Sequence, residues 1–225
     1  MMRHRSKQLE VLDAPNNPFE DIRSSLDFMV FVNRYFSGSR VVINYFERNR
    51  VPDKFSVLDL GFGSGDIPFA LTQWAEKNGK DISITAVDIN AHCHAYAATR
   101  FPSPRIRYLN HSAFDLEALG SFDYIISSMF FHHLTDEEIV RLLKIIDRQN
   151  RMGFIINDLY RSHRNYLGAL LLSFFWFNKT VYHDAKLSVC RAFKEKDLIR
   201  YREETGIAFK ITREPLFRAV MSRHA

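Results

Sequence analysis

A short apolar run followed by three closely spaced glycines, in the segment Ser56–Asp66, constrains the fold of this 225-residue chain more than any other feature. The run Val57–Leu60 has the length and composition of a strand buried on both faces. Gly61, Gly63 and Gly65 follow at alternate positions, and glycine permits a positive φ and the close approach of a ligand to the backbone. The next residues carry an apolar stripe at helical spacing. The segment therefore predicts a strand, a tight turn and a helix that together bind a nucleotide-type cofactor.

The residues around these glycines argue against a dinucleotide. The dinucleotide pattern Gly-x-Gly-x-x-Gly places its third glycine where this chain has Asp66. Asp59, two positions before the first glycine, would repel a pyrophosphate and attract an amino group. The pattern resembles motif I of the class I S-adenosylmethionine (SAM)-dependent methyltransferases, whose cofactor carries an ammonium group and no phosphate. The resemblance implies SAM as the cofactor and S-adenosylhomocysteine as its product.

Strand-like and helical segments alternate along the rest of the chain. Four more apolar runs read as strands: Ile82–Asp88, Ile106–Asn110, Phe122–Ser128 and Gly153–Asn157. This alternation predicts an α/β fold with a doubly wound, mostly parallel sheet, whose ligands bind at the carboxyl ends of the strands. The resemblance implies a Rossmann-like sheet of seven strands, completed by an antiparallel hairpin over residues 207–221. We expect residues 1–49, with a turn at 14–18, to form a tail and helical cap over the cleft, and residues 50–225 to form the SAM-binding domain.

The predicted strand ends supply candidates for the cofactor site. Asp88 comes 23 residues after Gly65, close to the spacing at which a carboxylate accepts the ribose hydroxyls of a nucleoside. Where the resemblance implies an acid for the adenine amino group, this chain has Ser112; Ala113 is retained, and Asp115 is either the substitute acid or a helix cap. The predicted cofactor-binding residues are Asp59, Gly61, Gly63, Gly65, Asp88, Ile89, Ser112, Ala113 and Ser128.

Candidate catalytic groups follow the fourth and fifth strands. A phenol has a pKa of about 10, so a histidine beside it is a sensible base. His132 and His133 leave the fourth strand together, and because adjacent side chains diverge there, we expect only one of them to reach the substrate. Asp158 ends the fifth strand, where it would orient a histidine or face the cofactor. His183 and Asp184 are expected on a loop that covers the substrate, with a loop-ordering hydrogen bond as the alternative.

Several segments outside motif I recur together in one group, which indicates the substrate class. Separately, Phe131–Leu134 followed by Thr135, Asp136 and Glu138 resembles motif IV and its downstream turn in methyltransferases of the ubiquinone and menaquinone type, and Thr135 with Glu138 predicts a capping box at the start of the next helix. The segments that recur together are Leu9–Pro15, Val32–Gly38, Asn157–Leu159, and the residues His183, Asp184, Ser188 and Arg191–Phe193. They resemble the small bacterial methyltransferases found with type III polyketide synthases, which are similar to ubiquinone and menaquinone methyltransferases. The resemblance implies O-methylation of a small phenolic or quinol molecule of polyketide type. A C-methyltransferase of quinone biosynthesis and a SAM-binding protein without catalysis are the alternatives.

The apolar segment Tyr166–Phe177 is expected either to line a substrate pocket facing the N-terminal helices or to form core or a homodimer contact. It is too short to span a bilayer. His92 and His94 do not share a helix face, so we expect no metal site.

The net charge of +5 comes with scattered arginines, and Ser-Ser-Met-Phe after the fourth strand differs from the Asn-Pro-Pro-Tyr of nucleic-acid methyltransferases, so we expect no nucleic-acid partner. Two distant cysteines, Cys93 and Cys190, suit a reducing cytoplasm.

Overall fold

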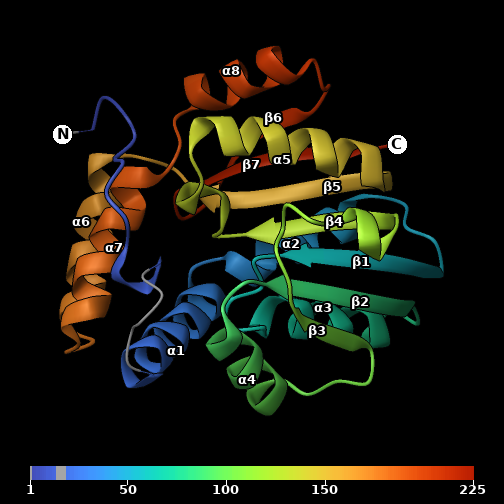
Figure 1. Cartoon of the computed structure of the whole chain (residues 1–225), viewed down its shortest axis with the longest axis horizontal. Coiled ribbons are helices and arrows are strands. Elements are labelled where there is room, and N and C mark those ends of the chain that lie inside the picture. The colour runs from blue at the N-terminus through green and yellow to red at the C-terminus, as the bar shows by residue number, and fades with distance from the viewer. Residues whose placement is uncertain (1, 14–18) are drawn as a thin grey trace.

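The computed structural model describes residues 2–13 and 19–225, so the predicted turn at 14–18 lies outside the described residues. Within these residues, seven strands form one sheet in the order β3-β2-β1-β4-β5-β7-β6 (Figure 1). The strands are β1 (Lys54–Leu60), β2 (Asp81–Asp88), β3 (Ile106–Asn110), β4 (Phe122–Ser128), β5 (Asn150–Leu159), β6 (Lys210–Glu214) and β7 (Arg218–His224). Strands β1 to β5 run parallel, and β7 is antiparallel to both β5 and β6. The predicted doubly wound sheet with a C-terminal antiparallel hairpin is confirmed.

Helices cover both faces of this sheet. They are α1 (Phe19–Tyr35), α2 (Gly38–Arg48), α3 (Asp66–Lys77), α4 (Ala91–Arg100), α5 (Asp136–Gln149), α6 (His163–Phe174), α7 (Lys179–Arg191) and α8 (Glu195–Thr205). Because successive side chains of a strand point to opposite faces, Val57 of β1 packs into the core beneath α2, α3 and α4, and Leu58 packs into the core beneath α5 and α8. The strand is buried on both sides, as its continuous apolar run predicts.

The turn after β4 has a defined start and stop. A short 3₁₀ helix, η3 (Phe131–His133), follows the strand, and α5 begins three residues later. The hydroxyl of Thr135 accepts a hydrogen bond from the backbone N–H of Glu138 at 3.2 Å, and the Glu138 carboxylate accepts one from the N–H of Thr135 at 2.8 Å. This confirms the capping box expected from the sequence. It holds η3, and with it His132 and His133, at the carboxyl end of β4.

Helices α6 and α7 pack together beside the sheet, next to α1 (Figure 1). The loop expected around His183 is wrong, because α7 begins at Lys179, where the Asn178 side chain caps it by accepting from the N–H of Val181 at 3.0 Å. Helix α6 is buried on one side only, although its sequence from Tyr166 onward is apolar on all sides. Leu167 and Leu171 are each 54% exposed on its outer side. No helix of the described residues is both long enough and apolar enough to cross a bilayer.

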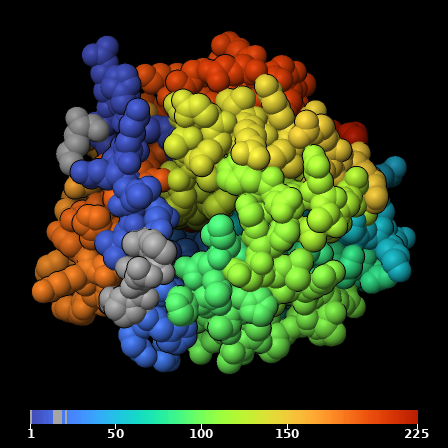
Figure 2. Space-filling view, viewed as in Figure 1, coloured from blue at the N-terminus to red at the C-terminus, as the bar shows by residue number. Residues whose placement is uncertain are grey.

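Residues 2–13, which we call the N-terminal strap, cross between α7 and the turn that carries η3 (Figure 2, blue). The guanidinium of Arg5 donates to the carbonyl of Leu134 at 2.8 Å and to the carboxylate of Asp136 at 2.7 Å. The carboxylate of Asp184 accepts from the backbone N–H groups of Val11 at 2.9 Å and Leu12 at 3.0 Å. The strap is therefore hydrogen-bonded at both of its ends and forms one wall of the region described next.

The two N-terminal helices have different places. Ile22, Met29 and Asn33 of α1 lie at a cavity over the carboxyl ends of the strands. Helix α2 buries Val42 and Phe46 in the core on one face of the sheet. Helix α1 therefore borders this cavity, while α2 covers one face of the sheet.

Candidate active site

The glycine turn after β1 is held by the end of β2. Gly61, Gly63 and Gly65 have φ values of 68°, 54° and 79°, a region in which only glycine is free of strain. The N–H of Gly63 donates to Oδ2 of Asp88 at 3.0 Å, and the N–H of Asn90 donates to Oδ1 at 2.9 Å. These bonds aim the Asp88 carboxylate along the turn and leave lone pairs of its oxygens for a ligand.

A cavity of about 600 Å³ opens above this turn. Seven of the nine predicted cofactor residues line it: Gly61, Gly63, Asp88, Ile89, Ser112, Ala113 and Ser128. Asp59 and Gly65 are not among its lining residues. Gly65 is packed tightly, since a Cβ added there would lie 2.6 Å from Cβ of Ala97. Ser112 accepts from the N–H of Phe114 at 3.2 Å, and Asp115 lies outside the cavity wall.

Three neighbouring carboxylates form what we call the carboxylate floor: Asp88 lines the cavity, and Asp59 and Asp66 are buried near it without lining the cavity. Burial raises the pKa of Asp59 well above its usual range, and the neighbouring Asp66 and Asp88 raise it further. Within the described part of the chain, Oδ2 of Asp59 has no hydrogen-bond partner. Burial also raises the pKa of Asp66 to about 6, although hydrogen bonds from Ser64 and Asn33 favour its charged form. This arrangement resists ionisation until a cation is bound, so the floor of the cavity suits a positively charged ligand.

A second, smaller cavity of about 200 Å³ adjoins the first. We call it the acceptor cavity; it lies between α1, α6 and α7, and Phe28, Val32, Phe36, Ala169 and Leu172 supply apolar walls. Leu12, Met29, Asn33, Met129 and His133 line both cavities. Met129 has a φ of 59°, an unusual conformation for a side chain of this size, and it stands at the junction. Two ligands, one in each cavity, would therefore meet at Met129 and His133.

Both histidines of η3 line the acceptor cavity, so the expected divergence of their side chains is wrong. The 3₁₀ turn, unlike an extended strand, places the two rings 4.2 Å apart between centroids. Nδ1 of His132 lies 2.8 Å from Oδ1 of Asp158, and Nδ1 of His133 lies 2.8 Å from Oδ1 of Asp13. Each carboxylate fixes the Nδ1–H tautomer and turns Nε2 of its histidine the other way.

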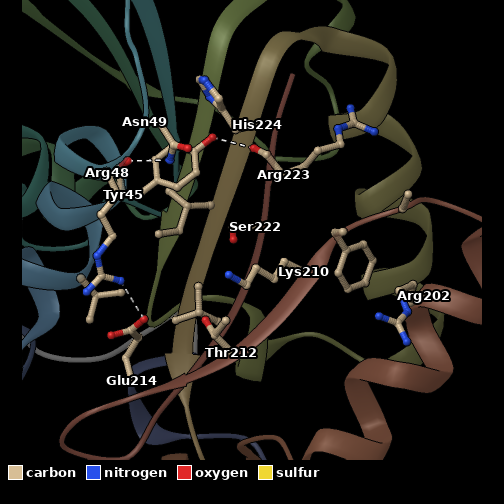
Figure 3. Close-up of a pocket in the computed structure, with 15 residues that line it drawn as sticks. Tyr45, Arg48, Asn49, Arg202, Lys210, Thr212, Glu214, Ser222, Arg223 and His224 are labelled. Carbon is tan, nitrogen blue, oxygen red and sulfur yellow. Dashed lines mark hydrogen bonds and ion pairs between the residues drawn. The ribbon is translucent and has the colours of Figure 1, made fainter.

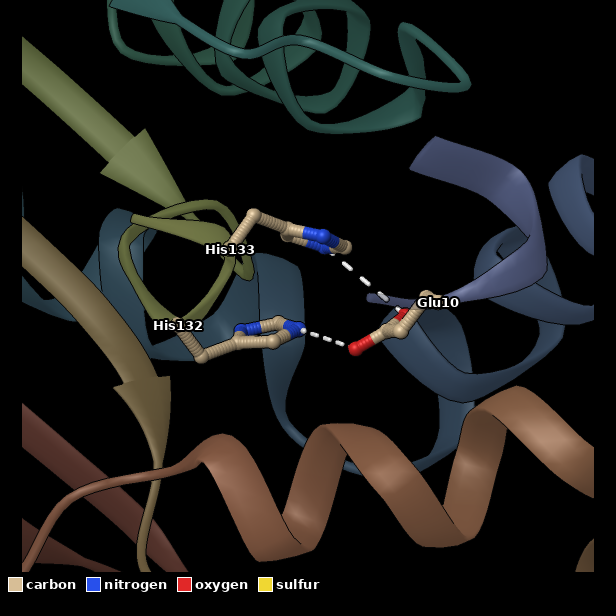
Figure 4. A group of neighbouring side chains, drawn as sticks. All are labelled: Glu10, His132 and His133. Atoms are coloured by element: carbon tan, nitrogen blue, oxygen red, sulfur yellow. Dashed lines mark ion pairs between the residues drawn. The ribbon is translucent and has the colours of Figure 1, made fainter. Parts of the chain in front are cut away.

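Glu10 of the strap faces both Nε2 atoms, as Figure 4 shows. Its carboxylate oxygens lie 3.6 Å from Nε2 of His132 and 4.0 Å from Nε2 of His133. Burial alone would lower the pKa of His133, but Glu10 and Asp13 raise it to about 9. Burial alone would raise the pKa of Asp158, but His132 lowers it. Glu10 is not among the residues predicted for the site from the sequence, although it lies in the segment Leu9–Pro15 that carries part of the family resemblance.

The remaining predicted catalytic pair lies at the edge of this region. His183 is 55% exposed in its side chain, does not line the acceptor cavity, and places Nδ1 2.9 Å from Oδ1 of Asp184. Asp184 borders the cavity, and its oxygens also accept from the strap. The structure thus brings His132, His133 and Asp158 together and leaves His183 outside.

A third hollow, of about 830 Å³, lies over β5, β7 and β6 beside α2 (Figure 3). Arg48 pairs there with Glu214 at 3.3 Å, and the hydroxyl of Tyr45 donates to the carbonyl of Arg223 at 2.6 Å. None of the predicted site residues lines this groove, and it shares no residue with the other two cavities.

Comparisons with known proteins agree with this geometry. Residues 57–153, just under half of the chain, match the family model described as a methyltransferase domain. The comparison with curated proteins returned no match.

Among solved structures, a Nostoc punctiforme protein proposed to be an O-methyltransferase is 13% identical with a TM-score of 0.67, over 98% of this chain and 64% of that protein. Magnesium protoporphyrin IX methyltransferase of Synechocystis, with bound S-adenosylhomocysteine, is 16% identical with a TM-score of 0.56, over 94% of this chain and 89% of that protein. Human N-acetylserotonin methyltransferase, in complex with SAM, is 18% identical with a TM-score of 0.61, over 96% of this chain and 62% of that protein.

The chain thus spans less than two thirds of the Nostoc and human proteins. At these identities the likeness shows the fold, which is that of the class I methyltransferases. Residues 57–153 match the model of a methyltransferase domain, and the chain shares its fold with solved methyltransferases that hold SAM or S-adenosylhomocysteine.

Proposed function

We propose that this chain, with its methyltransferase domain at residues 57–153, transfers a methyl group from SAM to a hydroxyl oxygen of a small apolar aromatic molecule. The observation that carries the proposal is the meeting of the two cavities at Met129 and His133. The larger cavity has a glycine turn and a carboxylate floor, and the smaller has apolar walls and a histidine cluster. A methyl donor and an acceptor placed in them would be neighbours, and such positioning accounts for much of the rate of a displacement reaction.

The residues of the larger cavity have the chemistry that SAM requires. Asp88, which already clasps Gly63, would accept hydrogen bonds from the ribose hydroxyls. Asp59 and Asp66 would attract the ammonium group, whose charge relieves the cost of ionising them. Ser112 and Ala113 lie where the adenine ring would rest. When bound, SAM supplies a methyl group on a positively charged sulfur that is open to in-line displacement.

The acceptor's hydroxyl group would lie against the histidine cluster. Asp158 orients His132 and stabilises positive charge on its ring. The acceptor oxygen would form a bond to the methyl carbon while the carbon–sulfur bond breaks and leaves its electron pair on sulfur, and the hydroxyl proton would pass to Nε2 of His132. Arg218, fully buried beside this cavity, places a positive charge near the developing phenolate. The apolar walls suit a phenol or quinol of polyketide type.

The carboxylate floor predicts how SAM affinity depends on pH. The pKa of Asp66 is raised to about 6 in the folded protein without ligand, above the value of 3.8 for an unperturbed carboxyl group. The protonated side chain therefore contributes folding stability that is fully present below pH 3.8 and is lost as the pH rises through 6. The bound ammonium offsets that loss. We therefore expect SAM to bind more weakly at pH 5 than at pH 8, and to raise the melting temperature more at pH 8.

Calorimetric titration at the two pH values measures this. The isosteric variant Asp66→Asn should bind SAM with a flatter pH profile. An unchanged profile in the variant would remove Asp66 from the cofactor site.

The proposed activity is tested by incubating the full chain with SAM and a panel of phenols and quinols that differ in alkyl chain length. We expect S-adenosylhomocysteine to form in step with a product that is heavier by one methylene unit, and turnover to rise with the apolar character of the acceptor. Mass spectrometry and fragmentation distinguish an O-methyl from a C-methyl product. No binding heat with SAM or S-adenosylhomocysteine would refute the proposal; a C-methyl product would replace the oxygen acceptor by ring carbon.

A further inference from the structure

We propose that Glu10, His132 and His133 form a binding site for a divalent transition-metal ion of the zinc type at the polar end of the acceptor cavity. A carboxylate and two imidazoles are the ligand set that catalytic zinc sites use when they leave one position open. One oxygen of Glu10 and the Nε2 atoms of both histidines lie within 4.8 Å of one another. Figure 4 shows the two rings side by side, each with Nε2 turned toward the Glu10 carboxylate.

The distances within this group fit an intervening ion better than direct contact. The separations of 3.6 Å and 4.0 Å between Glu10 and the two Nε2 atoms exceed the length of a hydrogen bond. Two ligand atoms that share a tetrahedral zinc ion, each at about 2.1 Å, are separated by about 3.4 Å. Shortening the 3.6 Å and 4.0 Å separations to this value would move the ligand atoms by less than ~1 Å. Glu10 is 4% exposed and His132 is 2% exposed, so two of the three ligands are shielded from bulk solvent.

Each of the three side chains is held from behind, as metal ligands are. Asp158 and Asp13 accept from Nδ1 of His132 and His133, an arrangement that fixes the ring orientation and makes Nε2 a better donor to a metal. The hydroxyl of Ser188 donates to Oε1 of Glu10 at 2.9 Å. Without an ion or an added proton, the electron-rich lone pair of each Nε2 would face the negatively charged Glu10 carboxylate, and the two would repel each other.

The local charges also favour a cation. Three carboxylates, those of Glu10, Asp13 and Asp158, surround the two imidazoles. Two arginines offset part of this charge: the Arg191 guanidinium lies 3.6 Å from Oδ2 of Asp13, and the buried Arg218 interacts with the charge of Asp158. A buried excess of negative charge is costly unless it is paired with a positive charge or coordinates a metal. An ion here would also tie the strap, through Glu10, to η3.

The role of this site in catalysis rests on the proposed function. Glu10, His132 and His133 all line the acceptor cavity, so the side of the site without a protein ligand faces the substrate. A divalent ion lowers the pKa of a hydroxyl that approaches it, because its charge favours the ionised form. The proton then passes to solvent rather than to Nε2 of His132, and the two histidines act as ligands.

The test measures metal binding by the full chain independently of methyl transfer. The protein is stripped with a chelator, titrated calorimetrically with Zn²⁺, and loaded with Co²⁺ for visible absorption. We expect about one ion per chain, a visible Co²⁺ band typical of a low-coordinate site, and a rise in melting temperature with added Zn²⁺. Glu10→Gln and His133→Gln should each weaken binding ~100-fold or more, and Asp158→Asn ~10–100-fold.

His163→Gln is the matched control, because His163 is exposed at the start of α6 and does not line the acceptor cavity. It should bind Zn²⁺ as tightly as the wild-type chain. Binding by wild type that Glu10→Gln does not weaken, or no binding by wild type, overturns the site. Because the wild-type titration needs no variant, a variant that fails to fold leaves this test intact. SAM binding and methyl transfer by the stripped protein are measured separately: full turnover without any ion would overturn the metal role while supporting the proposed function.

Discussion

His132→Gln is expected to lower the turnover number for methyl transfer ~100-fold or more, with little change in the dissociation constant of SAM. The side chain is buried in the wall of the acceptor cavity, where its Nδ1 lies 2.8 Å from Oδ1 of Asp158. Glutamine is chosen because its amide can still donate to Asp158, whereas alanine would leave a buried carboxylate without this partner, a change that often costs several kcal/mol. Turnover by mass spectrometry and SAM affinity by calorimetry give the two quantities.

Two matched variants make this result specific. His163→Gln carries the same substitution at an exposed position and should keep wild-type turnover. His183→Gln tests the third histidine proposed from the sequence, and we expect at most a few-fold loss, because its side chain is outside the acceptor cavity. If His132→Gln retained full turnover with a normal melting temperature, His132 would have no part in activating the acceptor, whether as base or as metal ligand.

Gly65→Ala is expected to reduce both stability and SAM affinity sharply. Its φ of 79° costs an alanine ~1–2 kcal/mol relative to an allowed conformation. The new Cβ would also lie 2.6 Å from Cβ of Ala97 in α4, a clash between two short side chains that only a shift of the helix or the turn relieves. Such overpacking typically costs ~1–3 kcal/mol more. Any shift of the turn also moves Gly63 away from Asp88, so SAM should bind at least ~10-fold more weakly, by the free energy of one lost hydrogen bond to a charged group.

Gly79→Ala separates the two contributions. Gly79 has a φ of 64°, and a Cβ added there meets nothing within 4 Å. This variant should lose only the conformational term, a few degrees in melting temperature for a chain of this size, and should bind SAM normally. Denaturant unfolding and calorimetry of both variants provide the comparison. Equal stability losses in the two variants would show that the packing of Gly65 against α4 has no energetic weight.

The sheet and the cofactor cavity followed from local patterns. The run Val57–Leu60, alternation of strands and helices, and the glycine turn are features of neighbouring residues, and the topology rules for parallel sheets bring the strand ends together. That is why four residues from separate segments of the sequence could be predicted to lie at the same edge of the sheet: Gly61, Asp88, Ala113 and Ser128. The capping box at Thr135 was readable for the same reason, since both of its partners lie within four residues.

The structure of segments without such periodicity was predicted less accurately. The residues around His183 lack a sequence signal for helix strong enough to outweigh the loop interpretation, yet α7 forms because it packs against α6, α1 and the strap. The divergence expected for His132 and His133 assumed an extended chain, and the 3₁₀ turn of η3 overturned it. The division of the chain at residue 49 and the roles of the individual site residues stay predictions.

The sequence by itself determined the order of strands and helices, the glycine turn with its carboxylates, and the class of cofactor, because these depend on residues close together in the chain or on strand ends that any parallel sheet aligns. Only the tertiary structure decided what stands opposite the cofactor. Glu10 comes from the strap, His132 and His133 from η3, and Asp158 from β5, and no periodicity links them. Their meeting depends on how the strap, α1 and α7 pack over the sheet, which is a property of the whole fold.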